Sequence, residues 1–236
     1  MLIRLDKYLA DMGIGTRSQV KADIKKGKIN INGVVVKDPN LKIESDKDVV
    51  LYEGNPIVYE EFEYYMLNKP AGVVSATEDK KETTVVDLID SKKRSDLFPV
   101  GRLDKDTEGL LIICNDGVLC HNLLSPKKHV DKTYYVELDK PLDESMATNI
   151  CEGVYIEKDT KSLPATLEKI NDYNVYLTIR EGKFHQVKKM FHAVGTEVTY
   201  LKRVSMGTLK LDPTLKTGDY RPLTKDEIDL LKGLSS

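Results

Sequence analysis

The chain has 236 residues, of which 36 are Lys or Arg and 38 are Asp or Glu, so its formal net charge is −2. This balance excludes a polybasic, histone-like protein. Hydrophobic residues at 40% and charged residues at 31% are typical of a globular protein and not of a disordered one. The longest apolar run covers residues 110–114, far fewer than the roughly 18 that span a bilayer, so we expect no membrane helix.

The cysteines and the N-terminus bear on the compartment. Cys114, Cys120 and Cys151 are odd in number and show no CxxC spacing, which excludes a disulfide framework or a zinc ribbon and predicts a reducing cytoplasm. The charged Arg4 and Lys7 stand where a signal peptide needs its apolar core, so we expect no export. The length predicts either one large domain or a large domain together with a small one.

The first 28 residues are basic although the chain as a whole is nearly neutral. Seven basic residues stand against three acidic ones, a local charge of +4. Apolar residues at helical spacing predict one short helix, and Thr16 with Gln19 forms a capping box for a second. A hairpin around Asn32-Gly33 and a strand at residues 49–52 follow. We therefore expect residues 1–55 to form one compact unit.

A basic helix pair could simply be a solvated surface, so the residue pattern has to decide. Three segments together resemble the S4 RNA-binding domain over its whole length, namely Arg4-Leu5-Asp6-Lys7-Tyr8-Leu9, Thr16-Arg17-Ser18 and Lys28-Ile29-Asn30-Ile31-Asn32-Gly33. The resemblance implies that a basic helix face lies against structured RNA, with phosphate contacts from Arg4, Arg17, Lys21 and Lys25. Such contacts position RNA without reading its sequence, so the chemistry stays open.

Beyond a linker at residues 56–63, strands and helices alternate through residues 64–236. Strands are expected at 64–67, 110–114 and 133–138, and a hairpin at 167–170 with 175–179. Helices are expected at 84–89, 118–124, 142–151, 184–194 and 224–234, the last with a Thr224/Glu227 capping box. Neither a doubly wound order nor a glycine-rich phosphate loop occurs, so the fold class is α+β with a mostly antiparallel sheet.

The segment from Gly101 to Gly109 carries three acids at alternate positions, Asp104, Asp106 and Glu108. The first positions of this segment match the start of a calcium-binding loop. The twelfth position of such a loop requires a bidentate glutamate, but the residue there is Asn115. A magnesium site needs converging carboxylates, for which Arg102 and Lys105 compete. Surface turn residues in salt bridges are the third interpretation.

Two further segments combine charge with an apolar face. The predicted helix at 184–194 has a polar stripe of His185, Lys188, Lys189 and His192, in which a cation can pair with an acid or face a phosphate. Lysines between the histidines disfavour zinc. The basic run Lys127-Lys128-His129 enters a strand with Tyr134 and Tyr135, of which only one can line a cleft while the other packs in the core. Such a cluster suits a flipped, stacked base.

Four motifs in order resemble the RsuA branch of RNA pseudouridine synthases. They are Asn68-Lys69-Pro70-Ala71-Gly72, Gly101-Arg102-Leu103-Asp104 through Thr107-Glu108-Gly109-Leu110, Lys132-Thr133-Tyr134, and Glu181-Gly182-Lys183-Phe184-His185-Gln186-Val187-Lys188-Lys189-Met190. With the S4 segment, the resemblance covers almost the whole chain and implies a central mixed sheet of two α+β halves, with the catalytic cleft across its middle. The overall length and the details Met66-Leu67-Asn68-Lys69-Pro70, Ser125-Pro126 and His185-Gln186-Val187-Lys188 are most similar to members that modify small-subunit (16S) ribosomal RNA.

The resemblance also assigns roles to single residues. It makes Asp104 the catalytic aspartate, Arg102 its neighbour in the loop, and Tyr134 the ring packed on the target base. Lys188 stands where many relatives have an arginine paired with the aspartate. Lysine would keep this ion pair but lose its bidentate geometry.

Moving a uracil from an N-glycosidic to a C-glycosidic bond requires no redox equivalent and no energy source, so no metal or organic cofactor is implied. The reaction requires an ionised nucleophile, which a neighbouring cation favours, and a uridine taken out of its stack. Asp104 can attack either the ribose at C1′ or the base at C6, and the sequence does not distinguish these two routes.

The expected partner is small-subunit ribosomal RNA, free or in an assembling ribonucleoprotein particle, and the expected state is a monomer without membrane contact. The main alternative is a non-catalytic S4-containing RNA-binding factor in ribosome assembly. A third is a magnesium-dependent RNA hydrolase that uses the three acids of the 101–109 segment.

Overall fold

The computed structural model describes residues 1–125 and 128–234. Pro126 and Lys127, which belong to a motif and to the basic run named above, lie outside the described residues, as do residues 235–236. By its internal contacts the chain divides into two compact units. One comprises Met1–Glu63 with Asp90–Leu97, and the other Tyr64–Ile89 with Phe98–Ser236.

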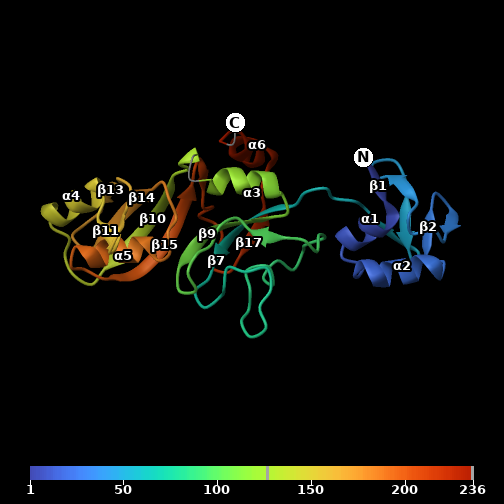
Figure 1. Cartoon of the computed structure of the whole chain (residues 1–236), viewed down its shortest axis with the longest axis horizontal. Helices are drawn as coiled ribbons and strands as arrows, with labels where there is room; N and C mark the ends of the chain where they lie inside the picture. The colour runs from blue at the N-terminus through green and yellow to red at the C-terminus, as the bar shows by residue number, and fades with distance from the viewer. Residues whose placement is uncertain (126–127, 235–236) are drawn as a thin grey trace. The chain divides into compact units, whose positions relative to one another are not determined.

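Two helices and short strands build the N-terminal unit (Figure 1). The helices are α1 (Leu5–Asp11) and α2 (Arg17–Lys25), and the predicted Thr16/Gln19 capping box opens α2. The strands are β1 (Leu2–Arg4), β2 (Ile29–Ile31), β3 (Val34–Val36), β4 (Lys42–Glu44), β5 (Val50–Tyr52) and β6 (Asn55–Ile57). β1 pairs with β4, and the other four form an antiparallel sheet in the order β3-β2-β5-β6. Residues 56 and 57 of the expected linker thus lie in β6.

Local chemistry explains these elements. Asn32 and Gly33 both have positive φ, 51° and 87°, as a type I′ turn between β2 and β3 requires, so the predicted hairpin is confirmed. The apolar faces of the two helices close over the strands and form a core whose buried members include Leu5, Tyr8, Leu9, Val20, Ile24, Ile29, Ile31 and Val50. This unit therefore has a hydrophobic core of its own.

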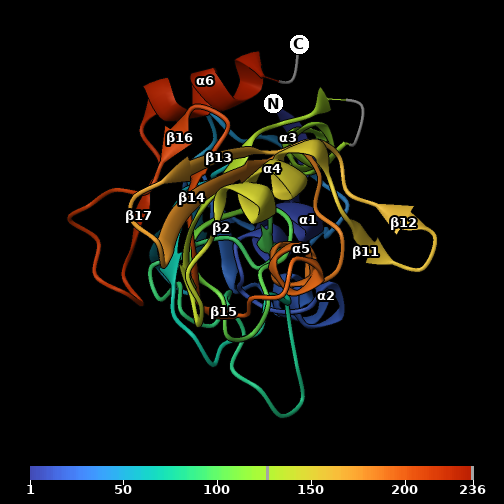
Figure 2. The same cartoon turned by 90° about the vertical axis from the view of Figure 1, so that its left-hand side faces the viewer.

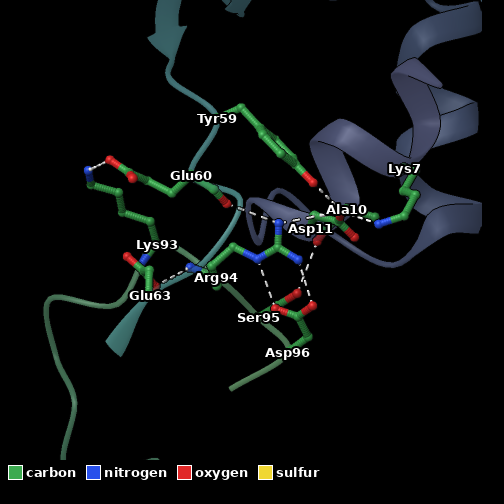
Figure 3. Close-up of polar contacts among 10 residues, drawn as sticks. All are labelled: Lys7, Ala10, Asp11, Tyr59, Glu60, Glu63, Lys93, Arg94, Ser95 and Asp96. Atoms are coloured by element: carbon green, nitrogen blue, oxygen red, sulfur yellow. Dashed lines mark hydrogen bonds and ion pairs between the residues drawn. The ribbon is translucent and has the colours of Figure 1, made fainter. Parts of the chain in front are cut away.

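Residues Asp90–Leu97, which come later in the sequence, belong to the same unit and are held there by Arg94 (Figure 3). The Arg94 side chain is 4% exposed. Its guanidinium donates to both carboxylate oxygens of Asp96 at 2.9 and 2.6 Å and to the carbonyl of Glu60 at 3.1 Å, and it lies 3.4 Å from an oxygen of Asp11. A buried charge network thus fixes this segment to α1 and to the chain after β6.

A mixed sheet of nine strands forms the centre of the described part of the C-terminal unit. The main order is β13-β14-β10-β15-β9-β7-β17, with β16 on β15 and β8 on β9. The strands are β7 (Tyr64–Lys69), β8 (Phe98–Pro99), β9 (Glu108–Cys114), β10 (Lys132–Leu138), β13 (Thr166–Lys169), β14 (Asn174–Ile179), β15 (Val198–Met206), β16 (Leu209–Lys210) and β17 (Tyr220–Pro222). Neighbours are antiparallel except for β15 and β9, which are parallel. The expected mixed, mostly antiparallel sheet is therefore confirmed, and its parallel pair joins two antiparallel halves.

Four helices surround this sheet, namely α3 (Gly117–Leu124), α4 (Glu144–Glu152), α5 (Gln186–Ala193) and α6 (Lys225–Gly233). α3 and α6 lie together and contribute Leu119, Leu123 and Leu231 to the core of β7 and β9 (Figure 1). α5 contacts β15 and β11 (Tyr155–Glu157), and β11 pairs with β12 (Thr160–Lys161). Figure 2 shows α5 nearly end-on beside these two strands. None of the helices in the described residues has the length and apolar character needed to cross a membrane.

Two helix predictions need correction. Residues 84–89 form only a turn: Thr84 and Asp87 exchange capping hydrogen bonds, but the chain leaves the turn to bury Val85 and Ile89 completely. The helix expected from residue 184 begins at Gln186, because His185 is left-handed with φ 52°. Phe184 and His185 therefore precede the helix, and the predicted polar stripe does not include His185.

Candidate active site

Asp104 lies in the loop between β8 and β9, just before the strand that joins the two halves of the sheet. The parallel pairing matches Glu108 with Lys202 and Gly109 with Arg203. Gly109 has a φ of 101°, and a Cβ there would lie 2.2 Å from the carbonyl oxygen of Arg203. Only glycine permits this close approach of β9 to β15, so it determines how the Asp104 loop enters the sheet.

A buried lysine binds the backbone of the same loop through hydrogen bonds. Lys69, at the end of β7, is completely buried, and its Nζ donates to the carbonyls of Pro70 and Thr107 at 2.9 Å and of Asp104 and Lys105 at 3.2 Å. Burial lowers the pKa of Lys69 to about 8, although nearby carboxylates oppose this shift. The ammonium thus fixes the backbone on both sides of Asp104.

Ser75 fixes the loop from another side. Its buried Oγ donates to the carbonyl of Leu103 at 2.8 Å and accepts from the amide of Leu103 at 3.1 Å. Both backbone groups of the residue before Asp104 are thereby engaged, so Asp104 projects from a braced backbone. The Asp104 side chain itself remains about a quarter exposed.

The side chain of Asp104 borders a narrow cavity of about 60 Å³. Tyr134 on β10, Lys188 on α5 and Arg102 line it together with the apolar Ile179, Val187 and Leu201. The structure thus brings together all four residues that the sequence predicted around the substrate. Arg102 is exposed, and it also borders a second, larger cavity.

The two tyrosines of β10 lie on opposite faces, as alternation predicts. Tyr134 is 7% exposed and lines the cavity. Tyr135 packs edge-on against Tyr176 and Tyr200 and donates to Glu137 at 3.0 Å. It is half-buried, so the expectation of a core position for Tyr135 holds only in part.

Lys188 is shared between two carboxylates. Its Nζ donates to both oxygens of Asp106 at 2.6 and 2.8 Å and lies 3.7 Å from Asp104 Oδ2. The hydrogen bond from Lys188 lowers the pKa of Asp106. His185 Nε2 approaches Asp104 on its other oxygen at 3.6 Å. The direct contact of Lys188 is therefore to Asp106, whereas its ion pair with Asp104 is looser than expected.

The third acid of the loop has a different partner from the two near Lys188. Asp106 and Asp104 both lie near Lys188, whereas Glu108 accepts a hydrogen bond of 2.8 Å from the Tyr200 hydroxyl. Throughout residues 1–125 and 128–234, no three His, Cys, Asp or Glu side chains gather closely enough to hold a metal ion.

In the N-terminal unit, three of the four predicted RNA-binding residues surround one acid. Arg4 donates to both oxygens of Asp6, at 3.0 and 2.8 Å, and Lys21 and Arg17 approach the same carboxylate at 3.6 and 3.7 Å. The Asp6 side chain is completely buried. Burial opposes its ionisation, but the hydrogen bonds and charges of these cations lower its pKa below 3.8. Lys25 is exposed one helical turn beyond Lys21 and outside this cluster.

Sequence reasoning assigned no role to Asp6, Lys69 or Ser75, and it considered His185 only as part of a polar stripe that could pair with an acid, face a phosphate or bind zinc. Lys69 and His185 lie in motifs that it singled out, yet nothing in a sequence distinguishes a buried lysine from an exposed one. Asp6 is one acid among several basic residues, which could have indicated an organising role.

Comparisons with known proteins identify the family of the chain and its N-terminal domain. The model of the family described as RNA pseudouridylate synthase matches residues 63–193, and the model of the S4 domain matches residues 3–50. The chain is 52% identical over 234 residues to "Uncharacterized RNA pseudouridine synthase YtzG" of Bacillus subtilis, covering 97% of this chain and 98% of that protein.

Two further relatives carry the name "Ribosomal small subunit pseudouridine synthase A". The Haemophilus influenzae protein is 41% identical and covers 97% of this chain and 99% of itself, and the Escherichia coli protein is 40% identical and covers 96% and 98%. Among solved structures, one titled "Crystal structure of pseudouridylate synthase" is 40% identical, with a TM-score of 0.69 and coverage of 97% of this chain and 99% of that one.

Proposed function

We propose, from the premise that this chain belongs to the RNA pseudouridylate synthase family and carries an S4 domain, that its substrate is one uridine of small-subunit (16S) ribosomal RNA. The chain is an RNA pseudouridine synthase, an isomerase that converts uridine to pseudouridine in ribosomal RNA. The small-subunit assignment is supported by relatives of that name at 40–41% identity over nearly the full chain. This catalytic function is favoured over a non-catalytic assembly factor.

One observation carries the proposed mechanism: Asp104, Tyr134 and Lys188 line a single narrow cavity together with apolar side chains, among them Ile179, Val187 and Leu201. We assign Asp104 as the nucleophile that attacks the flipped uridine at C1′ of the ribose or C6 of the base. Tyr134 lies against the uracil, and the apolar side chains of the cavity limit the access of water to the open glycosidic centre. The C1′–N1 bond breaks, the uracil turns, and C5 bonds to C1′. C5 loses its proton, N1 gains one, and the aspartate is released unchanged.

Two basic side chains beside Asp104 have a supporting role in this proposal. The Lys188 ammonium lies 3.7 Å from one carboxylate oxygen of Asp104 and places positive charge beside it, and the His185 imidazole lies 3.6 Å from the other oxygen. Arg102, exposed at the mouth, is placed to meet a phosphate of the RNA. The hydrogen bonds from Lys69 to the backbone carbonyls around Asp104 keep the Asp104 side chain oriented toward the reacting atom.

We assign RNA binding to residues 1–55 through Arg4, Arg17, Lys21 and Lys25, a linker to residues 56–63 and catalysis to residues 64–236. The cations around Asp6 are held in fixed positions, which suits the regular phosphates of a folded RNA. Both sites are complete within one chain, so we infer that a monomer acts on the RNA, free or in an assembling particle.

The decisive test maps pseudouridines in ribosomal RNA from cells with and without the protein, and then repeats the reaction with purified protein and Asp104→Asn. One small-subunit position should lose its modification without the protein. The variant should bind RNA and fold normally but form no pseudouridine, because an amide is nearly isosteric yet cannot supply the nucleophile. More than a few per cent residual activity would contradict the role of Asp104. Loss of a large-subunit position would contradict the substrate assignment.

A further inference from the structure

The exposed aromatic ring of Phe184 lies next to His185 and has no role in the mechanism above. The Phe184 side chain is 71% exposed. Its ring stacks on the imidazole of His185, with centroids 3.8 Å apart and planes 21° from parallel. His185 in turn reaches Asp104 at 3.6 Å. The apolar ring of Phe184 is therefore exposed to solvent and is separated from the nucleophile Asp104 only by the side chain of His185.

The backbone that presents this pair is strained and braced. His185 adopts a left-handed conformation at φ 52°, which is strained for a non-glycine residue, and its side chain does not cap α5. Gln186, which is buried, accepts from the amide of Lys183 at 2.9 Å and donates to Glu181 at 2.7 Å, so the loop before Phe184 is held at both ends. A rigid loop can offer a ring to a ligand with little loss of entropy on binding.

The surroundings indicate what such a ligand is. A second cavity, of about 420 Å³, is lined by Phe184, His185, Asp104, Lys105 and Lys183 among others. It shares Arg102, Asp104 and His185 with the narrow cavity, so the two adjoin at the nucleophile. Lys189 lies over the Phe184 ring at 5.1 Å. An aromatic face amid several cations favours a nucleobase with its phosphate over an apolar peptide.

We propose that Phe184, backed by His185, is a stacking platform for the base of a nucleotide next to the target uridine. This inference rests on the proposed function, since it places the target base in the narrow cavity and its neighbour in the larger one. Stacking of the neighbour would hold the strand open while the uridine is out of its stack. Because every base has a π-face, the platform tolerates different neighbours.

The test compares full-length wild type with Phe184→Ala, Phe184→Leu and Phe184→Trp. The first readout is kcat/KM on the ribosomal RNA fragment that the wild type modifies. The second is the affinity for a hexamer of uridine, which does not depend on turnover. We expect Ala and Leu to lose about 5- to 100-fold in both, corresponding to the roughly 1 to 3 kcal/mol of one stacked base, and Trp to remain within about threefold of wild type.

Two controls sharpen the result. Tyr173→Ala removes another exposed ring, from the turn between β13 and β14, and should change neither readout. An abasic residue beside the target uridine should weaken wild type as much as Phe184→Ala does, and the variant should lose nothing further on that RNA, because both changes remove the same stack.

Several outcomes would overturn the platform. They are unchanged hexamer binding in Phe184→Ala, full activity in Phe184→Leu, or additive losses from the variant and the abasic RNA. Should wild type modify no ribosomal RNA, the proposed function fails, while the hexamer measurement still decides whether Phe184 stacks a base.

Discussion

Lys188 contacts Asp106 directly and Asp104 at longer range, and this geometry follows from the kind of cation it is. A lysine ammonium is a compact charge with three rotatable donors, whereas an arginine fork would commit to one carboxylate in a bidentate manner. The family resemblance predicted an ion pair with Asp104. The structure shows that the Lys188 ammonium lies near two acids and that the His185 imidazole lies 3.6 Å from the other oxygen of Asp104.

Tyr134 and Tyr135 offer a test at the level of single side chains. Tyr134→Phe keeps the ring and should retain RNA binding, with turnover lost only so far as the hydroxyl takes part in proton transfer. Tyr134→Ala should lose about 1 to 3 kcal/mol of stacking. Tyr135→Ala should lower thermal stability, by about 1 to 3 kcal/mol for a half-buried ring, and leave single-turnover rates intact. A stable Tyr135→Ala protein without turnover would contradict the assignment of the two faces.

Asp6 predicts how the N-terminal unit responds to acid. Because the folded-state pKa of Asp6 lies below 3.8, its contribution to stability is complete above the unfolded pKa and is lost as the pH falls through the folded value. The stability of wild type should therefore fall relative to that of Asp6→Asn between about pH 5 and pH 3. Calorimetric unfolding of both proteins across this range measures the difference. A difference independent of pH would show that the three cations do not stabilise the charged form.

At the scale of elements, the parallel pair β9 and β15 is the feature on which the site depends. It joins two antiparallel halves, and the Asp104 loop ends where the pair begins. Two contacts position this loop. Gly109 allows β9 to approach β15 closely, and Lys69 donates hydrogen bonds to the backbone carbonyls of the loop. The loop is thereby positioned by backbone geometry more than by side-chain packing.

Gly109→Ala should consequently damage the enzyme without touching any catalytic side chain. The added Cβ would meet the Arg203 carbonyl at 2.2 Å, and alanine would be strained at φ 101°, so we expect a loss of at least about 2 kcal/mol of stability. Activity should fall further than the folded fraction does, because the loop shifts. Gly182→Ala is the matched control, since its Cβ would meet nothing within 4 Å. Equal stability of the two variants, measured by urea unfolding, would refute this account.

At the scale of the whole molecule, the two units have separate hydrophobic cores. The N-terminal unit buries its helices on its own strands, and the C-terminal unit encloses the sheet that carries Asp104. Residues Asp90–Leu97 are the exception, because the chain returns to the N-terminal unit after β7 and is held there by Arg94. The two units are therefore joined by more than one crossing of the chain.

Neutralising Arg4, Arg17, Lys21 and Lys25 together should weaken RNA binding and flatten its salt dependence. Removing one phosphate contact should lower the slope of log affinity against log salt by roughly 0.7 to 0.9. Folding and the isomerisation rate at saturating RNA should change little, since the cavity around Asp104 belongs to the other unit. Neutralising Lys42, Lys47, Lys210 and Lys216, four exposed lysines outside this cluster, removes the same net charge and serves as the control. An unchanged slope in the fourfold variant would show that this surface does not face the RNA.

The sequence by itself determined the elements whose signals are local. Capping boxes at Thr16 and Thr224, the Asn32-Gly33 turn and the alternation of β10 each depend on a few neighbouring residues, and the structure confirms them. Motif order was sufficient for the family and for the residues around the cavity. Only the tertiary structure decided which cation meets which acid, because Lys188, Asp104 and Asp106 are brought together by the pairing of strands and helices far apart in the chain.

The same limit explains what sequence reasoning missed. Residues 84–89 carry the pattern of a helix start, but the burial of Val85 and Ile89 overrides that local preference. Lys69 is buried because four carbonyls, three of them from a distant loop, surround its ammonium, and Arg94 is buried because Asp96, Asp11 and Glu60 converge on it. Such positions follow from long-range contacts, whose free energy depends on the packed whole and has no signature in a short window of sequence.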